Sequence, residues 1–120
     1  MQQTVTSLAP DMTALSGADP QEWYFSHGYT DGLPVVPPTP EKVEAMIQAL
    51  GGEPDHLESR VPPRWGGLTR RVLAINAVMA GCLPSYASVL RTAMRAMCEP
   101  HFNLNAIQAT THVIAPLVIV

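Results

Sequence analysis

A cysteine placed two residues ahead of a proline is the side chain in this sequence best suited to chemistry. Cys82 lies in the stretch GCLPS, and Pro84 is a typical first residue of a helix. The free N–H groups and the dipole at a helix N-terminus favour a thiolate. We therefore predict that Cys82 is a nucleophile or a ligand for a soft metal ion. The alternative is a small buried hydrophobic residue in a tight turn.

The second cysteine, Cys98, is too far along the chain to act together with Cys82. An uninterrupted helix between them, rising ~1.5 Å per residue, would hold them about 20 Å apart. A disulfide needs Cα atoms within about 7 Å of each other. We expect both thiols to be free, as in a reducing compartment.

Two histidines follow Cys98 at spacings that superficially resemble a zinc site. They are His101, in CEPH, and His112. A structural zinc site normally has four ligands with tighter signatures, so a helix cap is the favoured role for His101. His112 precedes an apolar segment and is a candidate general base, ligand or surface residue. The cofactor stays unknown, with a transition metal ion as one option.

Two loops stiffened by proline carry the remaining candidates. The first, HGYTDGLPVVPP at 27–38, contains Asp31 as its only carboxylate and Tyr29 as a candidate for substrate binding. Asp-Gly is ordinary turn chemistry, and the functional alternative is a catalytic carboxylate at the mouth of a pocket. The second loop, VPPRWGG, offers Arg64 and Trp65 for substrate binding, and we expect it to lie beside Asp31.

Asn76 is the polar exception in an otherwise apolar helix. A buried amide without partners costs a few kcal/mol, so we expect Asn76 either to anchor a loop or to reach a ligand. Anchoring is the favoured role.

Caps, prolines and apolar periodicity predict the elements that position these residues. We expect helices at roughly 20–27, 40–50, 69–81 and 84–98, and a proline- and glycine-rich connection at 53–67. The helices at 69–81 and 84–98 should form an antiparallel hairpin, with Arg91 and Arg95 facing outward. Residues 101–112 are ambiguous, and VIAPLVIV at 113–120 resembles a buried strand. The fold class is therefore mainly helical α+β.

The domain organisation follows from the same pattern. Residues 1–18 have no helical or strand period and form an N-terminal arm, while residues 19–120 form a single domain. The apolar strand at 113–120 has no turn or cap after it. We expect it to join a sheet completed by another chain, which makes this domain one half of a composite.

Composition excludes several classes of function. Charged residues make up 14% of the 120 residues, well below the usual quarter, which favours burial against a partner. The net charge of -3 offers no basic face for nucleic acid. No apolar run reaches the ~20 residues that span a membrane. The N-terminus lacks the features of a secretory signal, so we expect a cytoplasmic protein.

Four stretches carry a resemblance to a known family: YTDGLPVVPPTPEKVEAM, RVPPRWGG, LAINAVMAGCLPSY, and FNLNAIQATTH followed by APLVIV. Over residues 22–120 they resemble a little-characterised bacterial family associated with UGSC-type (seleno)proteins, some of them organomercurial-lyase-like. Family members continue beyond the LVIV strand into a glycine- and cysteine-rich half. The resemblance therefore implies a second, different polypeptide that carries this half. It also implies an active site at the junction, to which this chain contributes Asp31, Arg64, Trp65, Cys82 and His112.

Two hypotheses of different classes follow. The first is a subunit of a hetero-oligomeric enzyme, of lyase, hydratase or hydrolase type, that acts on a small molecule by thiolate or metal-assisted chemistry. An organomercurial-type lyase needs two thiols on one atom, so the second thiol would come from the partner. The alternative is a non-catalytic structural or maturation subunit that stabilises a catalytic partner. A free-standing metal-binding module is a third option.

Overall fold

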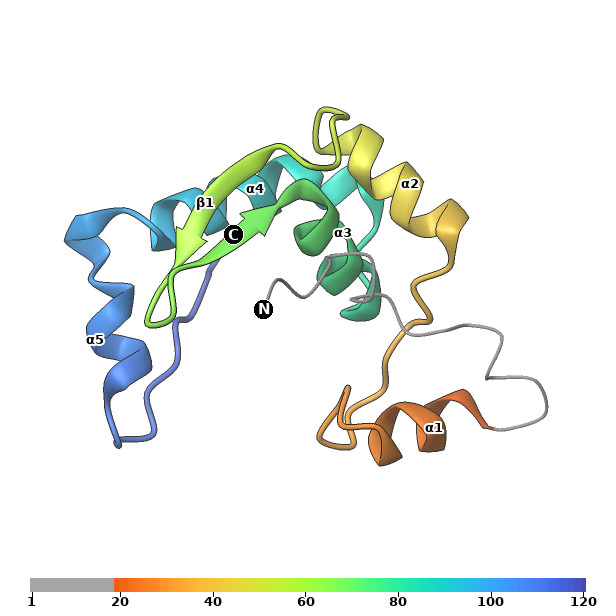
Figure 1. The fold of residues 1–120 in the computed structure, drawn as a ribbon, viewed down its shortest axis with the longest axis horizontal. Coiled ribbons are helices and arrows are strands. Elements are labelled where there is room, and N and C mark those ends of the chain that lie inside the picture. The colour runs from red at the N-terminus through yellow and green to blue at the C-terminus, as the bar shows by residue number, and fades with distance from the viewer. Residues whose placement is uncertain (1–18) are drawn as a thin grey trace, which may run out of the picture.

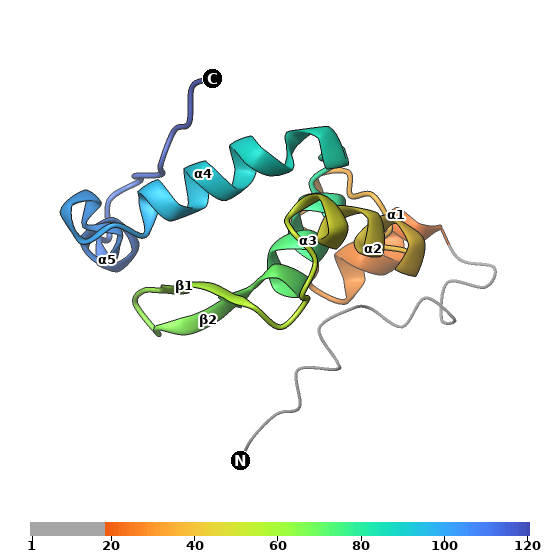
Figure 2. The same ribbon diagram turned by 90° about the horizontal axis from the view of Figure 1, so that it is seen from above.

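The computed structural model describes residues 19–120 and shows a mainly helical α+β chain (Figures 1 and 2). The predicted arm at 1–18 lies outside the described residues. No helix within the described part is long and apolar enough to cross a membrane. The elements in chain order are α1 (Pro20–Ser26), α2 (Pro40–Ala49), β1 (Leu57–Val61), β2 (Gly66–Thr69), α3 (Arg70–Met79), the 3₁₀ turn η3 (Pro84–Tyr86), α4 (Ala87–Met97), the 3₁₀ turn η4 (Pro100–Phe102) and α5 (Leu104–Ala109).

The spacing of cap residues and prolines predicts caps at Asp19, Thr39 and Thr69, and the structure confirms the side-chain cap bonds of the first and third, whereas Thr39 makes no such cap bond. Asp19 Oδ1 accepts a hydrogen bond from the backbone N–H of Gln21 at 3.0 Å, and Pro20 follows as the first residue of α1. Thr69 Oγ1 likewise accepts from the backbone N–H of Val72 at 3.3 Å at the start of α3. These bonds satisfy N–H groups that have no partner inside a helix.

The core lies between α2 and α3, whose apolar faces pack against each other. The periodic residues Met46, Ile47 and Leu50 of α2 are almost completely buried. Full burial of a side chain of this size contributes about 1.5–3 kcal/mol. The buried residues that meet them come from β2, α3 and α4: Leu68, Leu73, Ala74, Ala77, Val78 and Ala87.

The expected connection at 53–67 is wrong from Leu57 onward, because the chain there forms an antiparallel hairpin. Strands β1 and β2 pair from Leu57–Thr69 to Val61–Gly66. Proline and glycine are typical of loops, but they also mark hairpins. Here the prolines lie in the turn and the glycines begin β2, while Trp65 at the end of the turn has a left-handed φ of 55° and its carbonyl accepts a hydrogen bond from Arg60 Nη1 at 3.2 Å.

The predicted pairing of the third and fourth helices also needs correction. α3 packs mainly against α2, and α4 diverges from α3 after the Gly81 turn (Figure 2). Within α4 only Ala87 is buried, while Leu90 and Met94 are partly covered by the core. The opposite side of α4 is therefore left open.

A β-bulge in β1 places a carboxylate inside the protein. Leu57 pairs with Thr69 and Ser59 pairs with Leu68, so Glu58 is the extra residue. Its side chain is 1% exposed and accepts hydrogen bonds from Arg70 Nε at 2.7 Å and from Arg91 Nε at 3.0 Å. The outward orientation predicted for Arg91 is therefore wrong, since its guanidinium binds Glu58.

Arg70 connects Glu58 to the end of α2. Its side chain is 7% exposed, and Nη1 donates to the carbonyls of Gly51 at 3.0 Å and Gly52 at 2.8 Å. These glycines lie just beyond the C-cap Leu50, so Arg70 holds the chain where it leaves α2. Gly51 has a φ of 109°, and a Cβ there would lie 3.4 Å from Arg70 Nη1. One arginine thus joins α2, β1 and α3.

The pKa of Glu58 reflects two opposing effects. Burial alone would raise it, but the hydrogen bonds and charges of Arg70 and Arg91 outweigh burial and hold the pKa below its ordinary value of 4.5. The carboxylate is therefore ionised and paired at neutral pH. Arg95 lies 4.0 Å away and is 62% exposed, so solvent screens its contribution.

Removing Arg70 should destabilise the protein strongly. Arg70→Ala leaves the Glu58 charge buried and two carbonyls of the α2 end without a donor, which should cost about 3 kcal/mol or more. Arg95→Ala is the matched control and should change the free energy of unfolding by less than about 0.5 kcal/mol. Urea denaturation of both variants measures the difference, and equal stabilities would contradict the role assigned to Arg70.

The same pair predicts how stability depends on pH. Because the folded pKa of Glu58 lies below the unfolded one, its contribution is complete above pH 4.5 and is lost as the pH falls from there through the folded pKa. Glu58→Gln should flatten this acid limb of the stability curve. Glu22→Gln, which removes an exposed carboxylate of α1, should leave the limb unchanged. An unaltered limb in Glu58→Gln would show that other groups control it.

Candidate functional site

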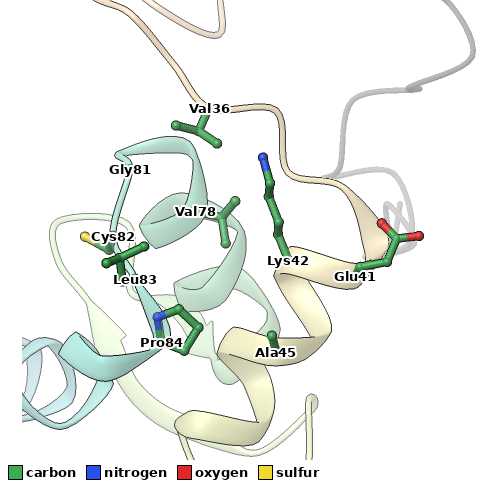
Figure 3. Close-up of a pocket in the computed structure, with 9 residues that line it drawn as sticks. All are labelled: Val36, Glu41, Lys42, Ala45, Val78, Gly81, Cys82, Leu83 and Pro84. Atoms are coloured by element: carbon green, nitrogen blue, oxygen red, sulfur yellow. The ribbon is translucent and has the colours of Figure 1, made fainter.

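A cavity of about 390 Å³ lies between α2 and the turn that follows α3 (Figure 3). Apolar side chains form most of its wall. Its titratable lining residues are Glu41, Lys42 and Cys82. This cavity contains the strongest candidate from the sequence, and it is the candidate site. The apolar residues in its wall are Val36, Ala45, Val78, Leu83 and Pro84.

Backbone hydrogen bonds fix two sides of the cavity. The N–H of Val36 donates to the carbonyl of Met79 at 3.0 Å, which ties the first proline-rich loop to the end of α3. The N–H of Cys82 donates to the carbonyl of Ala77 at 2.9 Å. Gly81, between them in the turn, has a φ of 81°, which glycine adopts without strain. The cavity wall is thus held by main-chain bonds rather than by side chains alone.

Two charged residues of α2 line the cavity in different ways. The pKa of Glu41 is lowered, chiefly by a hydrogen bond from its own backbone N–H and also by one from the Thr39 side chain. Its carboxylate is therefore hydrogen-bonded to groups at the start of α2. Lys42 is the only lysine in the sequence. In Figure 3 its side chain extends along the cavity toward Val36, while the Glu41 carboxylate points elsewhere.

Cys82 lies where the sequence placed it, just before a helical turn. Leu83 is the N-cap of η3, and η3 continues into α4. The thiol is free and partly buried, and it packs against the core. In Figure 3 its sulfur points away from Lys42. Within residues 19–120 no side chain forms a hydrogen bond with the sulfur, so the described chain contains no thiol–base pair. The role of Cys82 as nucleophile or ligand stays a prediction.

Asp31 has a structural partner within its own loop, and Tyr29 has one in α1. Asp31 Oδ1 accepts a hydrogen bond from the N–H of Leu33 at 3.3 Å, which is the ordinary turn geometry expected for Asp-Gly. The Tyr29 ring stacks on Trp23 with centroids 5.8 Å apart. Gln21 of α1, which the sequence did not single out, holds the loop by donating to the carbonyl of Leu33 at 2.8 Å.

The second loop does not lie beside the first. Arg64 and Trp65 occupy the exposed turn of the β1–β2 hairpin. Figures 1 and 2 both show this turn well apart from the loop after α1. The expected pocket joining Asp31 to Arg64 and Trp65 is therefore wrong for this chain by itself.

The two remaining candidates are exposed. Asn76 is on the outer face of α3 rather than buried, and its Nδ2 donates to the carbonyl of Val72 at 2.8 Å. His112 follows α5 in the chain, whereas Cys82 precedes η3 and α4. The backbone N–H of His112 donates to Thr110 Oγ1 at 3.2 Å.

The donor set of the described chain does not fit a transition metal site. No three side chains of His, Cys, Asp or Glu among residues 19–120 come together in a group that could hold a metal ion. This includes Cys98, His101 and His112. A metal ion would need ligands from outside residues 19–120.

Lys42 and Glu58 are the charged residues that sequence reasoning missed. Lys42 carried one available signal, since a single lysine in 120 residues is unusual in itself. The sequence around Glu58 gives no signal of its role, because its burial depends on a bulge and on arginines 12 and 33 residues away.

The chain was compared with protein-family models, curated proteins and solved structures, and none of them matches it. Its function must therefore be argued from its own surface and cavity.

Proposed function

We propose that this chain is a subunit that docks onto a second, different polypeptide through an apolar surface. The surface, here called the α4–tail surface, comprises Val89 and Ala93 of α4 and residues 117–120 of the tail. The observation that supports it is the exposure of these large apolar side chains next to the open side of α4. Leu117 is 83% exposed and Ile119 is 86% exposed.

The tail and α4 lie next to each other but do not close on each other. Val118, Ile119 and Val120 line one side of a hollow of about 340 Å³, and the α4 residues Ser88, Val89, Thr92 and Ala93 line the other. A hollow of this size beside apolar side chains leaves dispersion contacts unmade. Contiguous apolar surface rimmed by polar residues is typical of protein interaction sites.

The backbone of the tail is also free to pair. Within residues 19–120, the N–H groups of 117–120 make no backbone hydrogen bond, and no strand pairs with them. Residues such as Val118, Ile119 and Val120 favour a strand. The partner we propose therefore presents a strand edge, to which the tail adds by main-chain hydrogen bonds. Pro116 has no N–H and limits continuous pairing to the residues after it.

Two observations favour a different polypeptide over a second copy. The strands of this chain have only five and four residues, so the outer edges of its two-stranded sheet are short for pairing with the tail of a second copy. The family resemblance described above independently implies a partner carrying the rest of a composite fold. The charged fraction of 14% is in keeping with a subunit that is largely covered.

A matched pair of substitutions tests the surface. Leu117→Glu places a charge on the α4–tail surface, and Leu33→Glu makes the same change at a residue 68% exposed in the loop after α1. Both residues are exposed, so each variant should keep its free energy of unfolding within about 0.5 kcal/mol. In natively purified material, light scattering with mass spectrometry should show a second polypeptide in fixed ratio. Leu117→Glu should lose it, and Leu33→Glu should retain it.

Hydrogen exchange provides an independent measurement on the same complex. The N–H groups of 117–120 should exchange rapidly in the isolated chain and slowly in the complex. A monomer in native material would contradict the proposal, and so would a homodimer that Leu117→Glu dissociates.

The cavity favours a second candidate function, in which the complex is an enzyme and Cys82 takes part in its chemistry. The partner would then supply the second thiol, base or metal ligands that residues 19–120 do not bring together. Asp31 is the other residue to test, because Asn at this position can still accept the hydrogen bond from Leu33.

Turnover by the purified complex separates this enzyme from a structural subunit. Cys82→Ala should lower kcat by several orders of magnitude if the thiol is the nucleophile. Cys98→Ala removes the other partly buried thiol and should leave kcat unchanged. Full turnover in both Cys82→Ala and Asp31→Asn would exclude the catalytic role of this chain and leave the structural one.

A further inference from the structure

We propose that the cavity between α2 and the α3–η3 turn binds a small molecule with an apolar body and one carboxylate, which pairs with Lys42. This goes beyond the docking function, because Val36, Lys42, Ala45 and Val78 are not part of the α4–tail surface.

The size and lining of the cavity fit the apolar body of such a molecule. Its volume of about 390 Å³ lies within the ~300–1,000 Å³ typical of ligand pockets. Val36, Ala45 and Val78 line it from three different elements or loops. An apolar wall with few polar groups is typical of small-molecule sites, where the polar groups fix the orientation of the ligand.

Lys42 supplies the polar contact. Among the described residues its ammonium has no hydrogen bond and no ion pair, although it extends along the cavity (Figure 3). The nearest carboxylate in sequence, Glu41, is bound at the start of α2 and points away. The available charge at the cavity is therefore positive, which selects an anion over a cation. A charge-assisted hydrogen bond is about twice as strong as a neutral one.

The cavity is also preformed on the side opposite α2. The Val36–Met79 and Cys82–Ala77 backbone bonds hold the loop and the turn against α3. Little ordering is then needed when a ligand enters, which favours binding. Lys42, at the start of α2, is the flexible part that can adjust to the carboxylate.

The test uses octanoate as the probe and its neutral analogue octanamide as the comparison, with the full chain and calorimetric titration. Octanoate should bind saturably and more tightly than octanamide. Lys42→Gln should weaken octanoate binding at least ~10-fold and leave octanamide binding unchanged. Arg71→Gln removes one positive charge outside the cavity and should leave octanoate binding as it is. Ala45→Phe, at an exposed position of the wall, should fill the cavity and weaken binding of both probes.

The single lysine gives a direct spectroscopic readout. In protein labelled with ¹³C at lysine Cε, the side chain gives one signal, which octanoate should shift and octanamide should leave nearly unchanged. Three results would each overturn the proposal: no saturable binding of octanoate, equal affinity of octanoate for Lys42→Gln and the unaltered chain, or octanamide binding as tight as octanoate. None of these outcomes depends on the partner polypeptide.

Discussion

The buried pair of Glu58 and Arg70 is the interaction on which the rest of the structure depends. Glu58 is 1% exposed and Arg70 is 7% exposed, so neither charge can be buried without the other. Arg70 also binds the carbonyls that end α2, and Arg91 brings the middle of α4 to the same carboxylate. The relative positions of α2, β1, α3 and α4 are thus set by one polar network, and the apolar core fills the space between α2 and α3.

The sequence correctly predicted structural features that depend on neighbouring residues. It failed for features that depend on contacts between residues far apart in the chain. The caps at Asp19 and Thr69 and the apolar face of α2 follow from spacings of two to seven residues, and the structure confirms them. The β1–β2 hairpin was missed because its turn has the composition of a loop. Glu58 was missed because a one-residue bulge decides whether its side chain faces solvent or the interior.

Prediction of the candidate site from the sequence has the same limit, because it depends on how whole elements pack. The internal structure of each proline-rich loop was predictable, as the Asp31 turn shows. The distance between the two loops was not, because it depends on how α2 packs on α3 and on the direction of the hairpin. The turn of the β1–β2 hairpin and the loop after α1 therefore lie apart from each other (Figure 1). Cys82 was placed correctly because its position needs only the helix boundary that follows it.

The cavity and the α4–tail surface have a common origin in the direction of α4. Because Arg91 holds α4 to Glu58, α4 cannot fold back along α3, and its other side stays open to the tail. The cavity lies between α2 and the turn that leads into α4. Pro84 of η3 lines the cavity, and η3 continues directly into α4. A partner that moved α4 on docking would therefore also move one wall of the cavity.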